Sequence, residues 1–232
     1  MGNKSAQSRV ARMPGTLALV GGGEFHDGCD FDRQLLEASG GAEVLVVPAG
    51  AAFEHPDRLV TAAKAWFGSF GGRASAVPVL TRRDAMDVDH AAAVREARFI
   101  YLAGESPMHL RSVLKDTPVW EALVAAWQDG AVLAGSAAGA MVLTDPMVDP
   151  RGGAFTVGIG VVAPLAVVPH ADTWSEDKLH RTQVLAPKAT PVAGVDERTA
   201  LVRSPDGTWE AVGVGGVRVW LAGQPADLSS LP

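Results

Sequence analysis

The stretch that decides the fold is Ala131-Val-Leu-Ala-Gly-Ser-Ala-Ala-Gly-Ala-Met-Val-Leu143. Its first four residues are apolar and predict a short buried strand, which ends at Gly135. A run of small and apolar residues that is compatible with a helix starts by Ala138. A strand, a tight turn and a helix, with glycines two residues before and two residues after a central residue, form the pattern of a nucleophile elbow. The central residue here is Ala137, so the pattern for a nucleophile is present and the nucleophile is not.

Strand and helix signals alternate on the N-terminal side of this stretch. Short apolar runs predict strands at residues 16–20, 43–48, 76–80 and 99–102. Helices are predicted between them, one at about residues 84–97 and two between residues 104 and 130. This repeated β-α order predicts an α/β fold with a mainly parallel sheet flanked by helices on both faces.

The pattern changes beyond Asp145, where a polar helix is predicted at residues 175–185. Short strands are predicted at residues 166–169, 190–196, 200–204, 209–214 and 217–221. Asp206-Gly207 and Gly215-Gly216 are typical of hairpin turns, so we expect a small antiparallel C-terminal annex. Residues 1–14 are predicted to be a flexible tail, and residues 15–232 a single domain.

Composition excludes several classes of function. The chain of 232 residues is 47% hydrophobic and 20% charged, as in an ordinary globular protein. Its net charge of −6 without a basic patch argues against nucleic acid as a partner. No stretch approaches the roughly 18 apolar residues of a membrane span, and no secretory signal is present, so a cytoplasmic location is expected by default. Cys29 is the single cysteine, which excludes an intramolecular disulfide and a thiolate zinc site, and no histidine pair has metal-ligand spacing.

Candidate catalytic groups follow the predicted strands. In an elbow, the amide after the central residue helps to bind an oxyanion, and here that amide belongs to Ala138. Gly104, which follows the 99–102 strand, is well placed to supply a second donor, with Gly22-Gly23 as the competing choice. His170 and Glu197 each follow a later apolar strand and complete an arrangement of the Ser-His-acid type.

Several motifs together resemble one known family. They are Gly21-Gly-Gly-Glu24, Val46-Val-Pro-Ala49, Tyr101-Leu-Ala-Gly104, Gly135-Ser-Ala-Ala-Gly139 and Gly194-Val-Asp-Glu-Arg-Thr-Ala-Leu201. The chain is similar over residues 16–204 to peptidase family S51, the serine peptidases that include aspartyl dipeptidase (dipeptidase E) and cyanophycinase. Members of this family share a class I glutamine amidotransferase-like fold.

The resemblance implies a Ser-His-Glu triad that hydrolyses small or unusual peptides near an acidic residue, without a metal or an organic cofactor. The family serine falls on Ala137 and the family base on His170. The family acid falls on Glu197, with Asp196 as the neighbouring candidate. A homodimer is common among such relatives.

The chain departs from the family pattern at three places. Val168-Pro169 replaces the Asp-Gln that precedes the histidine in cyanophycinases, which argues against cyanophycin as the substrate. Ala103-Gly104-Glu105 replaces the usual Gly-Gly-(Asn/Asp). We interpret Ala137 first as a deliberate serine-to-alanine replacement that leaves an inactive chain. The alternatives are a natural non-catalytic relative that binds a ligand, and Ser136 acting in its place.

Four further residues are predicted to bind substrate. Glu24 and Glu105 follow glycine turns at the same end of the sheet and could bind a substrate amine or a basic side chain, or could be exposed loop carboxylates. Arg111 could neutralise that group or hold a substrate carboxylate, and Ser136 lies beside the central residue of the elbow. A small peptide or amide is therefore the expected substrate.

Overall fold

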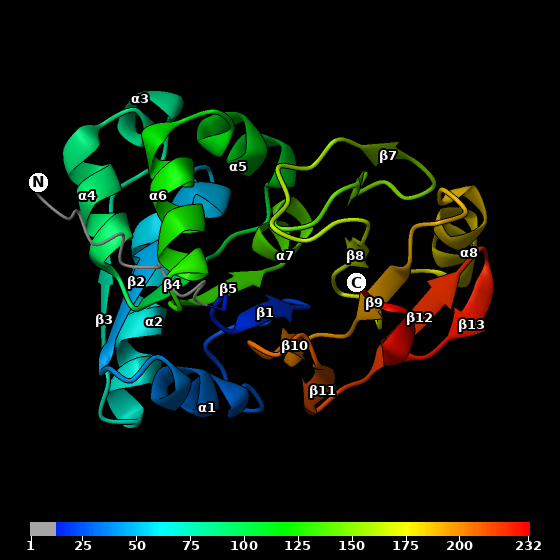
Figure 1. The fold of residues 1–232 in the computed structure, drawn as a ribbon, viewed down its shortest axis with the longest axis horizontal. Coiled ribbons are helices and arrows are strands. Elements are labelled where there is room, and N and C mark those ends of the chain that lie inside the picture. The colour runs from blue at the N-terminus through cyan, green and yellow to red at the C-terminus, as the bar shows by residue number, and fades with distance from the viewer. Residues whose placement is uncertain (1–12) are drawn as a thin grey trace, which may run out of the picture.

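The computed structural model describes residues 13–232, and a seven-stranded sheet forms the centre of the molecule. The strand order is β11-β10-β1-β5-β4-β2-β3 (Figure 1). Strands β1, β2, β3, β4 and β5 are parallel to one another, and β10 and β11 extend the sheet in antiparallel fashion beside β1. The seven strands are β1 (Leu17–Val20), β2 (Glu43–Val47), β3 (Arg73–Ala76), β4 (Phe99–Leu102), β5 (Val132–Ser136), β10 (Thr199–Arg203) and β11 (Trp209–Gly213).

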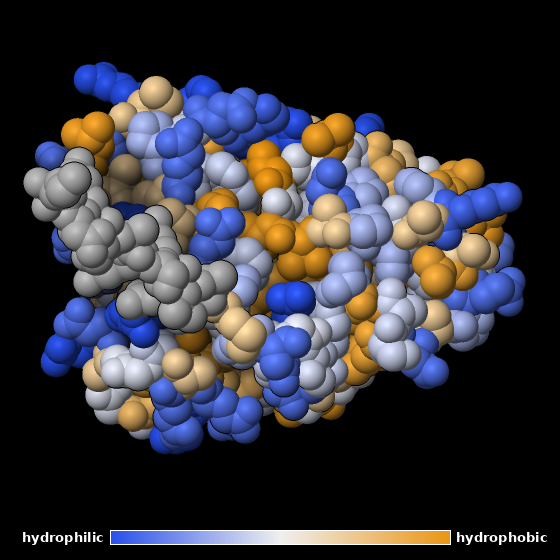
Figure 2. Space-filling view, in the orientation of Figure 1, coloured by the Kyte–Doolittle hydropathy of each residue, from blue (hydrophilic) through white to orange (hydrophobic). Residues whose placement is uncertain are grey.

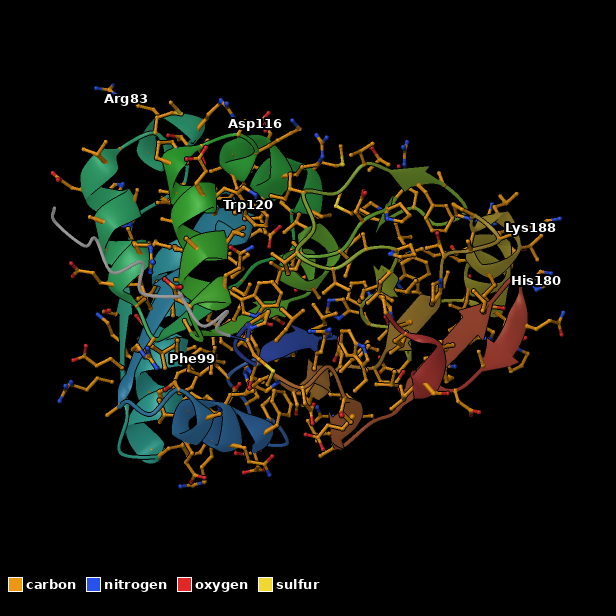
Figure 3. The ribbon with its side chains drawn as sticks, viewed as in Figure 1. Arg83, Phe99, Asp116, Trp120, His180 and Lys188 are labelled. Atoms are coloured by element: carbon orange, nitrogen blue, oxygen red, sulfur yellow. The ribbon has the colours of Figure 1, made fainter. Side chains whose placement is uncertain are left out.

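Helices cover both faces of this sheet. Successive side chains along each strand point to opposite faces, so the apolar ones form two separate cores that both need to be covered. Leu17 and Leu19 of β1 belong to one core, and Ala18 and Val20 belong to the other. The first core packs under α3 (Arg82–Ala85), α4 (Val88–Glu96), α5 (Pro107–Leu114), α6 (Pro118–Gln128) and α7 (Ala138–Val142). The second core packs under α1 (Phe31–Ala38) and α2 (Pro56–Ser69). Trp120 of α6 packs against the first core, and Phe99 of β4 belongs to the second (Figure 3).

A second, four-stranded sheet of order β13-β12-β9-β8 lies at the other end of the molecule (Figure 1). Its strands are β8 (Ala166–Val168), β9 (Val192–Val195), β12 (Val217–Leu221) and β13 (Gln224–Ala226), with α8 (Glu176–Leu185) beside them. Strands β8 and β9 are parallel and the other pairs are antiparallel. The short elements are β6 (Met147–Val148), β7 (Phe155–Thr156), η1 (Pro48–Ala51) and η2 (Leu228–Ser230). Apolar atoms gather in the middle of the face in Figure 2, between the helices at one end and the second sheet at the other.

The structure confirms the predicted α/β class with its mainly parallel sheet, and it corrects three details. The third strand is at residues 73–76, and it does not run through Pro78, which lacks the N–H that would continue the ladder. The helix predicted at 84–97 is two helices, because the Asp87 carboxylate caps a new start by accepting the N–H of Asp89. Gly215-Gly216 is not a hairpin turn, since β11 and β12 belong to different sheets.

Of the predicted tail, residues 1–12 lie outside the described residues. Between residues 13 and 232, no helix has both the length and the apolar character that a membrane crossing requires.

Candidate functional site

The turn between β5 and α7 has the backbone conformation that the glycine pattern predicts. Ala137 adopts φ 48° and ψ −106°, a region that L-residues seldom occupy. A side chain at Gly139 would place its Cβ 2.4 Å from the carbonyl oxygen of Leu102, and one at Gly135 would lie 2.6 Å from the carbonyl carbon of Gly139. Both glycines are therefore needed for α7 to pack closely against β5 and β4.

Three strained residues are held on the last residue of β1 and on the turn that follows it. Ala137, His170 and Arg198 donate their backbone N–H groups to three consecutive carbonyl oxygens, those of residues 20, 21 and 22, at 3.0, 2.7 and 2.8 Å. The three donors have φ angles of 48°, 50° and 53°. Left-handed conformations of non-glycine residues cost about 1–3 kcal/mol each, and they concentrate at functional sites. Segments that are far apart in the sequence are thus brought together at the carboxyl end of β1.

Gly22 is the residue that makes room for the histidine ring. Its φ is +109°, and a Cβ added there would lie 2.1 Å from Cε1 of His170. The ring of His170 therefore lies directly against the Gly22 backbone. Gly22 of the Gly22-Gly23 pair, the competing choice for the second oxyanion donor, lies against the histidine in this structure.

Two carboxylates hold the ring of His170 from opposite sides. Nδ1 lies 2.9 Å from Oε1 of Glu197, and Nε2 lies 3.1 Å from Oε2 of Glu105. An ionised carboxylate can only accept a hydrogen bond, so with both glutamates ionised both ring nitrogens donate and the ring is an imidazolium. The hydrogen bond to Glu105, followed by the one to Glu197, raises the pKa of His170 to about 9, although burial acts in the opposite direction.

The loop after β9 places Glu197, and not Asp196, beside the histidine. Asp196 binds elsewhere: its Oδ1 accepts a hydrogen bond from the guanidinium of Arg218 at 3.0 Å, and its Oδ2 accepts one from the N–H of Gly216. The N–H of Glu197 donates to the carboxylate of Asp172 at 3.1 Å. Asp172 had no signal in the sequence, because its partner lies in a loop that is 25 residues away along the chain.

The predicted pair of oxyanion donors is not formed. The N–H of Ala138 donates to the carbonyl oxygen of Gly104 at 3.0 Å, so Gly104 presents an acceptor to Ala138. The side chain of Ala137, the central residue of the turn, is only 1% exposed. The N–H of Ala138 is thus bound to the segment that follows β4.

A pocket of about 310 Å³ opens beside the histidine. Its lining includes Glu105, Ala138, Met141, His170, Trp174 and Lys178. The Lys178 ammonium lies 3.5 Å from the centre of the Trp174 ring, and burial lowers the pKa of this lysine. Lys178 was not predicted, because the 175–185 segment that contains it has the composition of a solvated helix, and Trp174 directly precedes that segment. Its exposed His180 lies at the outer end of the molecule (Figure 3).

Three of the predicted substrate-binding residues lie outside the pocket lining. Ser136 is completely buried, and its hydroxyl donates to Oε2 of Glu24 at 2.7 Å. Burial raises the pKa of Glu24, and the neighbouring charge of Glu105 adds to this effect. Arg111 donates from Nε to the carbonyl oxygen of Val157 at 2.5 Å and so ties α5 to the segment after β7.

Metal-binding side chains are not clustered in the part of the chain that the structure describes. Among residues 13–232, no three His, Cys, Asp or Glu side chains are grouped so that they could hold a metal ion.

With this geometry in view, the comparisons define the class of protein. The model of peptidase family S51 matches residues 17–209, and the chain therefore belongs to this family. A peptidase from an acI-B1 actinobacterium, known from its crystal structure, is 29% identical, with a TM-score of 0.83 over 93% of this chain and 94% of that chain. A putative peptidase E protein from Listeria monocytogenes EGD-e is 16% identical, with a TM-score of 0.63 over 89% of this chain and 98% of that chain, and it supports the fold. No curated protein matches the chain.

Proposed function

We propose that the chain has the catalytic framework of a serine peptidase for small peptides, in which Ala137 occupies the position of the nucleophile. The observation that carries this proposal is the anchoring of Ala137 and His170, both with positive φ angles, on the adjacent carbonyl groups of residues 20 and 21 at the end of β1. Membership of peptidase family S51 supports the same conclusion.

A serine at position 137 would supply the attacking oxygen. Its hydroxyl would add to the carbonyl carbon of the peptide, while its proton would pass to Nε2 of His170. The imidazolium would then protonate the leaving amine, and water would hydrolyse the acyl-enzyme with the same group as base. Glu197, which is 2.9 Å from Nδ1, would orient the ring and stabilise its charge.

The remaining predicted residues have narrower roles in this proposal. Ala138 is the candidate oxyanion donor, and Gly104 would have to turn its carbonyl away before its own segment could help. Glu105 would meet a substrate amine, a role supported by its position in the pocket lining and by the 48% exposure of its side chain. A cytoplasmic location and a homodimer remain predictions.

The test is to replace Ala137 by serine and to assay short peptides, including Asp-Xaa and isoaspartyl dipeptides. Ala137→Ser should gain turnover by a large factor, since removal of the nucleophile from such a triad costs on the order of 10⁶ in rate. Ala138→Ser is the matched control, because it adds the same hydroxyl one residue away and should gain no turnover. If Ala137→Ser cleaves none of the peptides, the peptidase proposal fails.

The second candidate is a natural ligand-binding relative without catalysis. Ala137 itself favours it, because the residue is buried and carries no reactive group. The source gene distinguishes the two accounts: an alanine codon at position 137, together with an inactive Ala137→Ser protein that still binds dipeptides, would support the second candidate.

A further inference from the structure

Two groups that the proposed reaction needs are both occupied by one short segment, Gly104-Glu105. The carbonyl oxygen of Gly104 accepts a hydrogen bond from the N–H of Ala138, at 3.0 Å. Oε2 of Glu105 forms a hydrogen bond with Nε2 of His170, at 3.1 Å. The oxyanion donor and the base are therefore both engaged with the protein itself.

His170 cannot act as a base in this arrangement. Both of its ring nitrogens donate to carboxylates, so neither has a free lone pair to accept a proton. Before Nε2 can serve residue 137, the contact with Glu105 must break and the ring must lose one proton to solvent. Glu197 can remain on Nδ1 throughout.

The surrounding charges show what could break that contact. The ring contacts Glu105 from the loop after β4 and Glu197 from the loop after β9, and the charge of Glu24, in the loop after β1, acts on it without a contact. Lys178 of α8 lines the same pocket, but its ammonium is engaged over the Trp174 ring. The His170 side chain is 23% exposed and that of Glu105 is 48% exposed, so a ligand can reach the carboxylate from the pocket.

We propose that Gly104-Glu105 holds the site in a resting state, and that a substrate with a free ammonium group close to its scissile carbonyl releases this state by binding Glu105. A new cation beside Glu105 replaces the imidazolium as its partner, which frees Nε2 and allows the ring to lose its proton. As Glu105 turns towards the ammonium group, the adjoining Gly104 carbonyl moves away from the Ala138 amide. Gly104 has φ +120°, a conformation that a glycine leaves and enters without the restriction of a side chain. This proposal rests on the proposed peptidase function, but the resting state itself can be tested without any turnover.

The first experiment follows the protonation of His170 by NMR in the chain with Ala137. The Cε1–H signal of His170 is assigned by its loss in His170→Asn. We expect the ring to titrate near pH 9, and Glu105→Gln to lower this midpoint by about one to two pH units, because an opposite charge in contact has been removed. Asp177→Asn is the control, since it removes an equal charge from an exposed side chain on α8 that pairs with Arg181. A His170 midpoint near 6.5, or one that Glu105→Gln leaves unchanged, would overturn the resting state.

The second experiment adds alanyl-alaninamide or its N-acetyl form, at millimolar concentrations and near neutral pH. The free amine should shift the His170 signal towards that of the neutral ring, and the acetylated form should not. An unchanged signal with both compounds, or an equal shift with both, would overturn the role of the ammonium group. An inactive Ala137→Ser protein would remove the peptidase function and leave both NMR results standing, so the two failures can be told apart.

Discussion

Replacement of Gly22 by alanine tests whether the turn after β1 positions the histidine. The added Cβ would lie 2.1 Å from Cε1 of His170, whereas ordinary van der Waals contact begins at 3.4 Å, so the ring would have to withdraw by at least 1.3 Å. Overpacking of this kind costs about 1–3 kcal/mol. The φ of +109° adds about 1–3 kcal/mol of backbone strain for any L-residue.

Gly130→Ala is the matched control for that strain. Gly130 has φ +101°, and a Cβ added there would meet nothing within 4 Å. The effect of alanine on the unfolded chain is the same in both variants and cancels. Urea unfolding should therefore show Gly22→Ala to be less stable than Gly130→Ala by about 1–3 kcal/mol.

The displaced ring should also lose its two carboxylate partners. The midpoint of the His170 titration by NMR should fall from about 9 towards 6.5 in Gly22→Ala and should stay in place in Gly130→Ala. Equal stability of the two variants, with an unshifted His170 in both, would refute the positioning role of Gly22.

Three further outcomes are expected. Burial raises the pKa of Asp32 to about 8, so between pH 3.8, its ordinary pKa, and pH 8 the native state binds one more proton than the unfolded state. The free energy of unfolding therefore falls as pH rises through this range. Asp32→Asn should flatten this fall in urea titrations at several pH values, and an equally steep fall in the variant would contradict the shift. Burial raises the pKa of the Cys29 thiol to about 12, so a thiol reagent should label it in denaturant and leave the native protein unlabelled, and rapid native labelling would disprove this. Gly139→Ala should lower the free energy of unfolding by more than about 2 kcal/mol, because its Cβ would lie 2.4 Å from the carbonyl oxygen of Leu102, and a thermal melt unchanged from the parent would show that α7 can move away.

The amino-acid sequence was sufficient for the fold class and for the family. Apolar runs separated by glycine turns predicted the strands, since the alternation of buried strand and amphipathic helix is a local property of the chain. The glycine spacing around Ala137 predicted a sharp turn with close helix packing, and the structure has both. The same local signals failed at Gly215-Gly216, because whether two strands pair depends on which sheet each one joins.

Sequence reasoning also brought His170 and Glu197 into one site, and the structure places them 2.9 Å apart. It favoured Glu197 and kept the neighbouring Asp196 as a candidate, since adjacent residues in a loop point in different directions and only the fold decides which one meets the ring. It missed Lys178 and Trp174, whose stacking depends on how α8 lies against the pocket.

The sequence alone therefore determined the α/β class, the sharp turn at Ala137 and the residue types that gather at the strand ends, because these follow from periodicity and from the conformational needs of glycine. Only the tertiary structure decided how the side chains and backbone groups of the site are paired. Glu105 forms a hydrogen bond with Nε2 of His170, the Gly104 carbonyl accepts the N–H of Ala138, and Gly22 leaves room for the His170 ring. The physical reason is that hydrogen bonds between distant loops depend on ångström-scale placement, which no local pattern of residues specifies.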